Sequence, residues 1–158
     1  GMKLILQAQI TKDGYIARKD GLRDWYLKPE LFGVSNFLGN ASAMLYYEDG
    51  KCVIVTGQEE ISVEPSLLKE QLSSMATLSG YIALEASPQS APILRTLMAA
   101  HCISEIRLIH VPVKLRKGGI RFPVSEFKSH WKRISIEPSD REPCVLFSTY
   151  REKTNLPL

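Results

Sequence analysis

The sequence has few cysteines and histidines, and none of them is spaced as a metal-binding motif. Its three cysteines, Cys52, Cys102 and Cys144, lie far apart and form no CxxC or Cys/His pattern. We therefore expect free thiols in a reducing compartment, acting as small buried apolar side chains. The histidines are equally scattered, so we interpret them as structural residues and expect no metal site: His101, His110 and His130.

Long apolar runs are also missing. The longest stretches fall far short of the roughly 20 residues that span a bilayer. Lys3 and the short run Leu4–Leu6 lead directly into polar residues, which is unlike a signal peptide. These absences predict a cytoplasmic protein with no membrane partner. We interpret Gly1, before Met2, as a tag remnant and expect one domain over residues 2–158.

Strong charge of one sign is absent as well. The formal net charge is +3, with 23% charged and 44% hydrophobic residues over 158 positions. This is an ordinary globular composition, with enough chain to bury a core without disulfides or metals. The charge permits an anionic metabolite but is well below that of most nucleic-acid-binding domains, so we expect no nucleic-acid partner.

What is present is an alternation of apolar strands and helical stripes. Lys3–Ile10 is continuously apolar, which is typical of a strand in a sheet covered on both faces. Pro29 and Pro65 suit the first turn of a helix. Further strands are expected over 43–47, 51–56, 80–84, 105–113, 131–137 and 144–150, and helices from 29 to about 39 and over 65–75 and 91–101.

Two connections have a clear turn chemistry. The segment 11–25 carries two Asp-Gly pairs, which favour turns, so we expect a long ordered loop. The connector 48–50 between two strands is so short that it permits a hairpin. Because helices alternate with early strands, the sheet should be mixed and mostly parallel between helices, with antiparallel strands at the C-terminus.

One segment resembles a known family. The run 10–17 (ITKDGYIA), with a second Asp-Gly at 20–21 and Trp25, resembles the opening signature of the reductase domain of bacterial riboflavin biosynthesis, a relative of dihydrofolate reductase. The segment 101–122 and the last strand, ending at Tyr150, are similar to later parts of that family. The resemblance implies a three-layer α/β/α dihydrofolate-reductase-like fold, a homodimer, NADPH as hydride donor and a pyrimidine- or pterin-like substrate.

The resemblance also implies roles for individual residues. A hydride-transferring enzyme must hold the nicotinamide against its acceptor and exclude water. Ile10 and Thr11 would border the nicotinamide and Trp25 would cover it, although Trp25 also suits a plain core or interface position. Asp13 and Glu85 are the candidate catalytic residues, and with Asp24 they would bind substrate. Asp13 equally suits a purely structural turn.

The expected phosphate site follows the strand at 80–84. The stretch 84–90 (LEASPQS) resembles the family's Glu-Gly-Gly-Pro or Glu-Ala-Gly-Pro motif, but Ser87 stands where glycine is expected. The stretch could bind the cofactor at a helix N-terminus or simply cap the helix. Thr56 is a further candidate for the adenosine phosphate. The implied cofactor-binding residues of the motif are Ala86, Ser87, Pro88, Gln89 and Ser90.

A larger departure leaves two functions open. The family's Gly-x-x-Thr segment after the second strand has no counterpart, because 45–50 runs almost directly into the next strand. The chain is either an NADPH-dependent reductase, whose named family reaction transfers hydride to the ribose C1′ of an aminouracil phosphate, or a non-catalytic descendant that keeps fold and dimer without the cofactor. A basic cluster attracts a phosphorylated ligand or is a solvated turn, with nucleic acid as a third possibility: Lys114, Arg116, Lys117 and Arg121.

Overall fold

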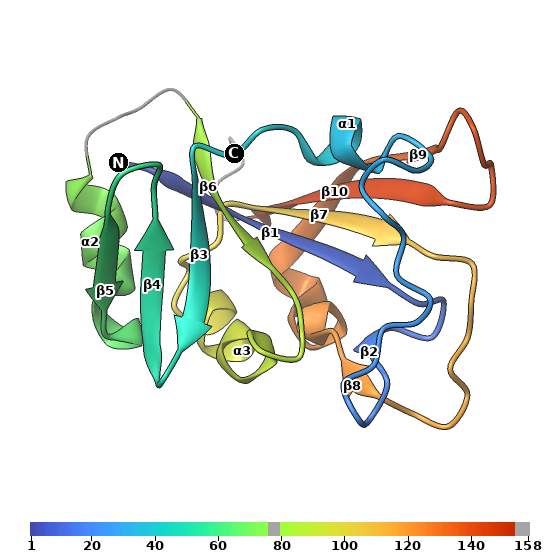
Figure 1. Cartoon of the computed structure of the whole chain (residues 1–158), viewed down its shortest axis with the longest axis horizontal. Coiled ribbons are helices and arrows are strands. Elements are labelled where there is room, and N and C mark those ends of the chain that lie inside the picture. Colours follow the sequence, from blue (N-terminus) through green and yellow to red (C-terminus); the bar gives the residue numbers. More distant parts are fainter. Residues whose placement is uncertain (76–79, 154–158) are drawn as a thin grey trace.

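The computed structural model describes residues 1–75 and 80–153, which contain an eight-stranded mixed sheet (Figure 1). Its strands are β1 (Lys3–Ile10), β3 (Ala43–Glu48), β4 (Lys51–Val55), β5 (Glu60–Val63), β6 (Tyr81–Glu85), β7 (Glu105–His110), β9 (Trp131–Pro138) and β10 (Leu146–Glu152). The order is β5-β4-β3-β6-β1-β7-β10-β9. The central strands β3, β6, β1 and β7 are parallel, and the outer pairs on both sides are antiparallel.

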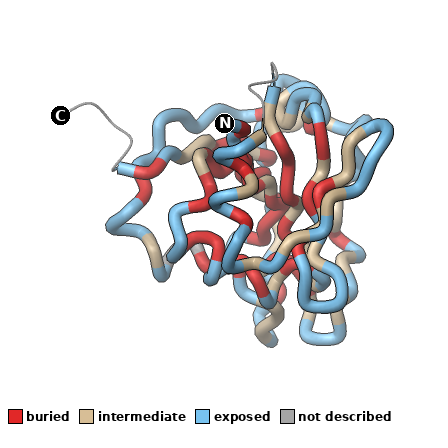
Figure 2. The backbone as a smooth tube through the Cα atoms, turned by 90° about the vertical axis from the view of Figure 1, so that its left-hand side faces the viewer, coloured by how far each residue is buried: buried red, intermediate tan, exposed pale blue. Residues whose placement is uncertain are grey.

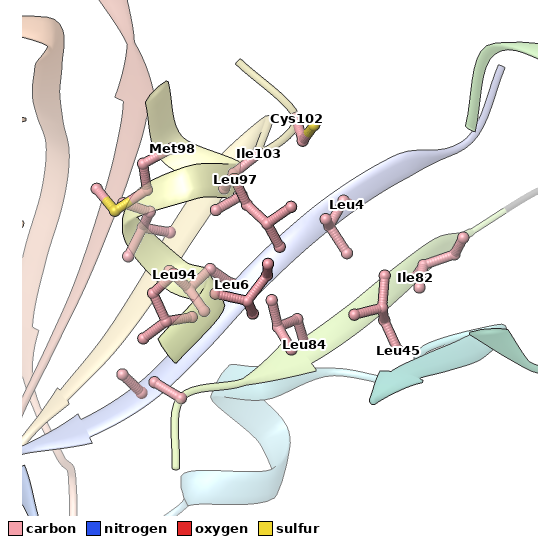
Figure 3. Packing of buried hydrophobic residues seen from close by; sticks show 14 of the residues in the cluster. Leu4, Leu6, Leu45, Ile82, Leu84, Leu94, Leu97, Met98, Cys102 and Ile103 are labelled. Atoms are coloured by element: carbon pink, nitrogen blue, oxygen red, sulfur yellow. The ribbon is translucent and has the colours of Figure 1, made fainter. Parts of the chain in front are cut away.

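One face of the sheet is covered by helices α2 (Leu68–Ser74) and α3 (Ala91–Ala99) and by the 3-10 segment η2 (Pro123–His130), with a short 3-10 turn η1 (Pro65–Leu67) before α2. Alternate residues of β1, from Leu4 to Ile10, belong to the buried cluster of this layer. Figure 2 colours the buried positions along the backbone, and Figure 3 shows the side chains of Leu4 and Leu6 pointing toward α3. Full burial of each leucine or isoleucine side chain stabilises the fold by roughly 1.5–3 kcal/mol. This layer is the main hydrophobic core.

The other face carries the short helix α1 (Val34–Leu38) and the segment that leads to it. Trp25 and Val34 pack there against Ile109 of β7 and Phe147 of β10. The rings of Phe37 and Phe147 are stacked, with centroids 4.7 Å apart. Since helices lie on both faces of the sheet, the expected three-layer α/β/α architecture is confirmed (Figure 1).

Helix α1 is shorter than the sequence predicts. It begins at Val34 rather than at Pro29, because Phe32 and Gly33 have positive φ angles of 54° and 80°. Positive φ is costly for a bulky residue, and tertiary contacts hold it in place. The buried Ser139 hydroxyl donates a hydrogen bond of 2.5 Å to the carbonyl of Phe32. The segment before Gly33 is therefore fixed by the β9–β10 turn instead of forming a helical turn.

The expected hairpin is present, and two unexpected features join it. Strands β3 and β4 pair antiparallel around Asp49 and Gly50, both with positive φ, as a two-residue hairpin turn requires. Strand β5 continues this meander and was not predicted. The expected loop 11–25 contains β2 (Tyr15–Ala17), which pairs with β8 (Ile120–Arg121) in a separate two-stranded sheet (Figure 1).

The cysteines are free thiols as expected, but only two of the three are buried. All three are free; Cys52 and Cys102 are buried and Cys144 is exposed. Burial raises the pKa of Cys52 to about 11, so its thiol is unreactive at neutral pH. The described residues form no group of three or more side chains able to hold a metal ion, and no described helix is long and apolar enough to cross a membrane.

Candidate functional site

The sheet topology creates a crevice at the carboxyl ends of β6 and β1. The chain leaving β6 enters α3 on one face, whereas the chain leaving β1 reaches α1 on the other face. Neighbouring parallel strands whose connections depart to opposite faces leave a crevice between those connections, the usual ligand site of α/β sheets. The hydrogen bonds between β3 and β6 also stop after Met44, so the two strands diverge toward this edge.

A cavity of about 200 Å³ occupies this edge, and we name it the switch-point cleft. Backbone and side chains of β3, β6 and the start of α3 form its walls, together with one residue of the loop 11–25. Its lining residues are Arg23, Met44, Leu45, Tyr46, Tyr47, Leu84, Glu85, Ser87, Gln89 and Ser90.

Glu85 is the best-anchored charged group in the switch-point cleft. Its Oε1 accepts hydrogen bonds from the Arg23 guanidinium at 2.9 Å and from the Tyr26 hydroxyl at 2.8 Å. The Arg23 guanidinium also lies 4.4 Å from the centroid of the Tyr26 ring. Burial, and then the negative charge of Glu85, raise the pKa of Tyr26 to about 12, so this hydroxyl stays a donor at neutral pH. No described residue bonds Oε2 of Glu85, which leaves one carboxylate oxygen for a ligand.

The segment after Trp25 is fastened across β1 beside this carboxylate. The buried Gln9 amide donates to the Leu27 carbonyl and accepts from the Leu27 N–H, both at 2.8 Å. Only a cavity of about 30 Å³ remains between Gln9, Tyr26 and Glu85, enough for about one water molecule. Any ligand of the switch-point cleft therefore binds on the β3 side of Glu85.

The predicted phosphate motif is hydrogen-bonded to itself. The Ser90 hydroxyl accepts the N–H of Ser87 at 2.9 Å and donates to the Glu85 carbonyl at 2.7 Å, and the N–H of Ser90 bonds the Ser87 hydroxyl at 3.3 Å. The N–H groups of Ala91 and Ile93 bond the carbonyls of Ser87 and Ser90. Because residue 92 is proline, it offers no donor.

This arrangement does not fit a dinucleotide. Pyrophosphate binding at a helix N-terminus needs unoccupied N–H donors, and those of Ser87, Ser90, Ala91 and Ile93 already have acceptors. The cleft volume of about 200 Å³ is below the roughly 300–1,000 Å³ of ordinary small-molecule sites. At the end of β3 the chain turns directly into β4, which leaves no room for a counterpart of the Gly-x-x-Thr segment. The backbone at position 87 does not require glycine, since Ser87 is not among the described residues with positive φ.

Asp13 acts as a clamp between two loops. Its carboxylate accepts the Thr11 hydroxyl at 2.7 Å and the backbone N–H groups of Leu115 and Arg116 at 3.0–3.2 Å. Burial alone would raise the pKa of Asp13, but these hydrogen bonds outweigh it and lower the pKa to about 2. Asp13 is thus ionised at neutral pH and has no proton to donate there. The geometry supports the structural turn interpretation.

The remaining predicted residues are dispersed. Ile10 and Trp25 are buried in the two hydrophobic clusters, and the indole N–H of Trp25 has no acceptor among the described residues. Asp24 is exposed and pairs with Arg18 at 2.6 Å. Thr56 follows β4, which runs antiparallel to β3, so Thr56 lies at the opposite end of the sheet from Ser87 (Figure 1).

The other members of the motif lie next to the cleft without forming a phosphate site. Ala86 is buried, and its N–H bonds the Gln7 carbonyl at 2.8 Å. Pro88 lies beside Gly21 of the loop 11–25. Gln89 is exposed and lines the cleft.

Sequence reasoning found Glu85 but missed the two residues that hold it, Arg23 and Tyr26. Arg23 lies in the loop 11–25 and Tyr26 directly follows it, 62 and 59 positions from Glu85 in the sequence. The only local signal was a run of charged and aromatic residues, 23–26, directly after two Asp-Gly turns. Contacts of this range are set by the topology, so no local pattern could reveal them.

Comparisons with known proteins place the fold. No family model matches the sequence, and neither does any curated protein. Among solved structures 62 chains match. A dihydrofolate reductase from Enterococcus faecalis, complexed with NADP(H) and RAB-propyl, matches with a TM-score of 0.56 and 15% identity over 96% of each chain. A protein from Shewanella sp. PV-4, provisionally assigned to riboflavin biosynthesis, gives a TM-score of 0.47 and 16% identity over 96% of this chain and 99% of that one. The match to the dihydrofolate reductase shows that this chain has the dihydrofolate-reductase-like fold, as expected.

Proposed function

We propose that the switch-point cleft binds a small aminated heterocycle, pyrimidine- or pterin-like, and that the chain is a non-catalytic descendant of the riboflavin-type reductases that binds this ligand without a dinucleotide. The observation that carries the proposal is the fixed carboxylate of Glu85. Arg23 and Tyr26 occupy one of its oxygens and leave the other without a partner among the described residues.

The chemistry of the switch-point cleft suits such a ligand. A carboxylate accepts hydrogen bonds from ring and exocyclic N–H groups, and such charge-assisted bonds are stronger than neutral ones. Tyr46 and Tyr47 supply aromatic surface on the β3 side, and Gln89 supplies an amide at the rim. A volume of about 200 Å³ favours a ligand of one or two rings over a dinucleotide.

Calorimetric titration with a diaminopyrimidine and with pterin tests this proposal. We expect saturable binding that Glu85→Gln weakens by about tenfold or more, because the amide replaces a charged acceptor. Glu59→Gln, in the exposed β4–β5 turn far from the cleft, is the matched control and should bind like the wild type. Absence of binding for both ligands, or binding that Glu85→Gln leaves unchanged, would contradict the proposal.

A second candidate is the NADPH-dependent reductase that the sequence resemblance implies, transferring hydride to a pyrimidine- or pterin-like acceptor such as an aminouracil phosphate. The buried indole N–H of Trp25 without a described acceptor favours it, because the resemblance puts Trp25 over the nicotinamide. This function requires the Ser90 hydroxyl to leave the N–H of Ser87. Oxidation of NADPH that depends on a pyrimidine or pterin, followed by absorbance, would replace the first candidate by this one.

Assembly and location are further proposals; the homodimer rests on the resemblance, and the location rests on the composition of the sequence. We propose a homodimer in the cytoplasm, with no nucleic-acid or membrane partner. The exposed edge strand β9, which carries the exposed Ile134 and Ile136, is available for contact with a second copy. Light scattering of the purified chain measures the molecular mass directly; a monomeric mass at high protein concentration would contradict the dimer.

A further inference from the structure

Positive charge is concentrated in two segments that lie together, residues 11–25 and 112–122, and we name them the basic lobe. They contain eight basic residues and only three acidic ones, a net charge of +5. The whole chain carries +3, so the remaining residues are net negative at −2. The basic residues of the lobe are Lys12, Arg18, Lys19, Arg23, Lys114, Arg116, Lys117 and Arg121.

The two segments of the basic lobe are held together tightly. Asp13 accepts the N–H groups of Leu115 and Arg116, and the N–H of Lys12 bonds the Val113 carbonyl at 2.8 Å. Strands β2 and β8 pair alongside. Arg116 has a φ of 65°, a costly conformation that these contacts maintain. The loop that presents the cations is therefore fixed rather than free.

A cavity of about 240 Å³ lies between the two segments, lined by Arg18, Lys19, Asp20, Leu115, Lys117 and Gly118. The Lys19 side chain extends over Gly118, because a Cβ placed on this glycine would lie 3.2 Å from Cε and 3.8 Å from Nζ of Lys19. Lys19 thus reaches from the first segment to the backbone of the second, beside Lys117.

Of the basic residues that line this cavity, Arg18 has an acidic partner, whereas Lys19 and Lys117 have none among the described residues. Arg18 pairs with Asp24 at 2.6 Å and also feels the charge of Asp20; these contacts raise the pKa of Arg18, chiefly through the hydrogen bond to Asp24. Neither Lys19 nor Lys117 forms an ion pair with any described residue. Asp20 is the one acidic residue among the residues that line this cavity, beside three basic ones. Two ammonium groups without an ion-pair partner among the described residues, at a concave site of net positive charge, attract an anion.

We propose that this cavity binds the phosphate group of a small phosphorylated molecule through Lys19 and Lys117. Lysine is a common phosphate ligand that acts as a point charge. The cations converge on a cavity instead of forming a stripe with exposed aromatic residues, which favours a small molecule over nucleic acid. This inference does not rest on the proposed function, since the cavity and the switch-point cleft share no lining residue.

Titration of the full chain with inorganic pyrophosphate, followed by calorimetry and by amide NMR shifts, tests the inference. We expect saturable binding with shifts at Gly118 and its neighbours. The double variant Lys19→Gln/Lys117→Gln should weaken binding by about tenfold or more, since it removes two charged contacts. Both side chains are exposed, so the variant should fold, and its thermal unfolding midpoint verifies this.

The matched control is Lys28→Gln/Lys132→Gln, which removes the same charge from exposed lysines outside the basic lobe. This control should bind pyrophosphate like the wild type. If both double variants lost affinity equally, the loss would come from the change in overall charge, and the proposed site would be wrong. Glu85→Gln should leave pyrophosphate binding unchanged, because Glu85 does not line this cavity. The test of this site can therefore fail or succeed independently of the test of the switch-point cleft. Binding to single- or double-stranded nucleic acid that is tighter than to pyrophosphate and steeply salt-dependent would overturn the small-molecule ligand.

Discussion

The hydroxyl of Ser90 lies 2.9 Å from the backbone nitrogen of Ser87, and the hydroxyl of Ser87 accepts the N–H of Ser90 in return. Each serine thus satisfies a donor that a phosphate would otherwise meet at the start of α3. A glycine at position 87 could not make this reciprocal pair, because it has no hydroxyl. The departure from the family motif at Ser87 therefore changes the hydrogen-bond chemistry of the turn, not only its shape.

Ser90→Ala should destabilise the protein by about 1 kcal/mol, because it removes the bonds to the Ser87 N–H and the Glu85 carbonyl. Urea denaturation measures this change. Ser73→Ala is the control: within the described part of the chain its exposed hydroxyl bonds only the Lys69 carbonyl of the same helix, so stability should hardly change. Equal losses in the free energy of unfolding for the two substitutions would contradict a stabilising role of the Ser87–Ser90 pair.

Asp13 should make stability depend on pH in the acid range. Its pKa is lowered to about 2 in the folded state from an ordinary value of 3.8. A lowered carboxylate pKa stabilises the fold above the unfolded value, and this stabilisation is lost as pH falls from about 4 toward 2. Asp13→Asn should flatten that part of the stability curve and destabilise the protein at neutral pH.

Chemical denaturation of wild type and Asp13→Asn between these pH values is the measurement. Asp20→Asn serves as control, because among the described residues the Asp20 carboxylate accepts a hydrogen bond only from the N–H of Leu22, in the same exposed turn. A wild-type curve as flat as that of Asp13→Asn would show that the clamp carries no pH-linked stability.

His110 should destabilise the fold at mildly acid pH. Burial, and then the charge of Arg133, lower the pKa of His110, whose Nε2 lies 2.6 Å from the Ser148 hydroxyl. Because the unfolded chain takes up this proton more readily, stability should fall as pH drops through about 6.5. His110→Gln should reduce the fall between pH 7 and 5, whereas His130→Gln, at an exposed position, should not. Parallel curves for all three proteins would contradict this role.

Glu105 balances two arginines on the second face of the sheet. Its carboxylate bonds Arg107 at 2.6 Å and Arg151 at 3.2 Å, and its side chain is only 11% exposed. Glu105→Gln should cost about 2 kcal/mol, because it weakens two charge-assisted hydrogen bonds of a largely buried carboxylate. Glu126→Gln, which breaks an exposed pair with Arg95, should cost at most about 1 kcal/mol. Urea denaturation compares the two, and a smaller loss for Glu105→Gln than for Glu126→Gln would contradict the assignment.

Much of the fold follows from local pattern. Strand β1 has the bounds predicted from its continuous apolar run, and α2 and α3 lie within the ranges predicted from their apolar stripes. These elements bury one stripe or two faces, so burial leaves a periodic trace in the sequence. Strand β5 (Glu60–Val63) has no such trace, because it lies at the sheet edge and alternates between exposed and half-buried residues.

The site was less accessible to sequence reasoning. Thr56 is a cofactor candidate because it follows a strand, but β4 runs antiparallel to β3. Thr56 therefore lies at the opposite end of the strands from the switch-point cleft. The sequence around Trp25 suits both a ligand contact and a core position, and the structure places Trp25 in a buried cluster with Val34 and Ile109. Strand direction and the course of the loop 11–25 depend on contacts distant in sequence, which no short motif specifies.

The occupied N–H donors at the start of α3 should prevent dinucleotide binding, and calorimetric titration with NADPH, with NADH for comparison, tests this directly. We predict no binding of either dinucleotide at millimolar concentration by the wild type. A Ser87→Gly/Ser90→Ala variant, which frees the N–H of Ser87, should bind NADPH more tightly than the wild type does. Micromolar binding of NADPH by the unaltered chain, with preference over NADH, would contradict the account and establish a working cofactor site.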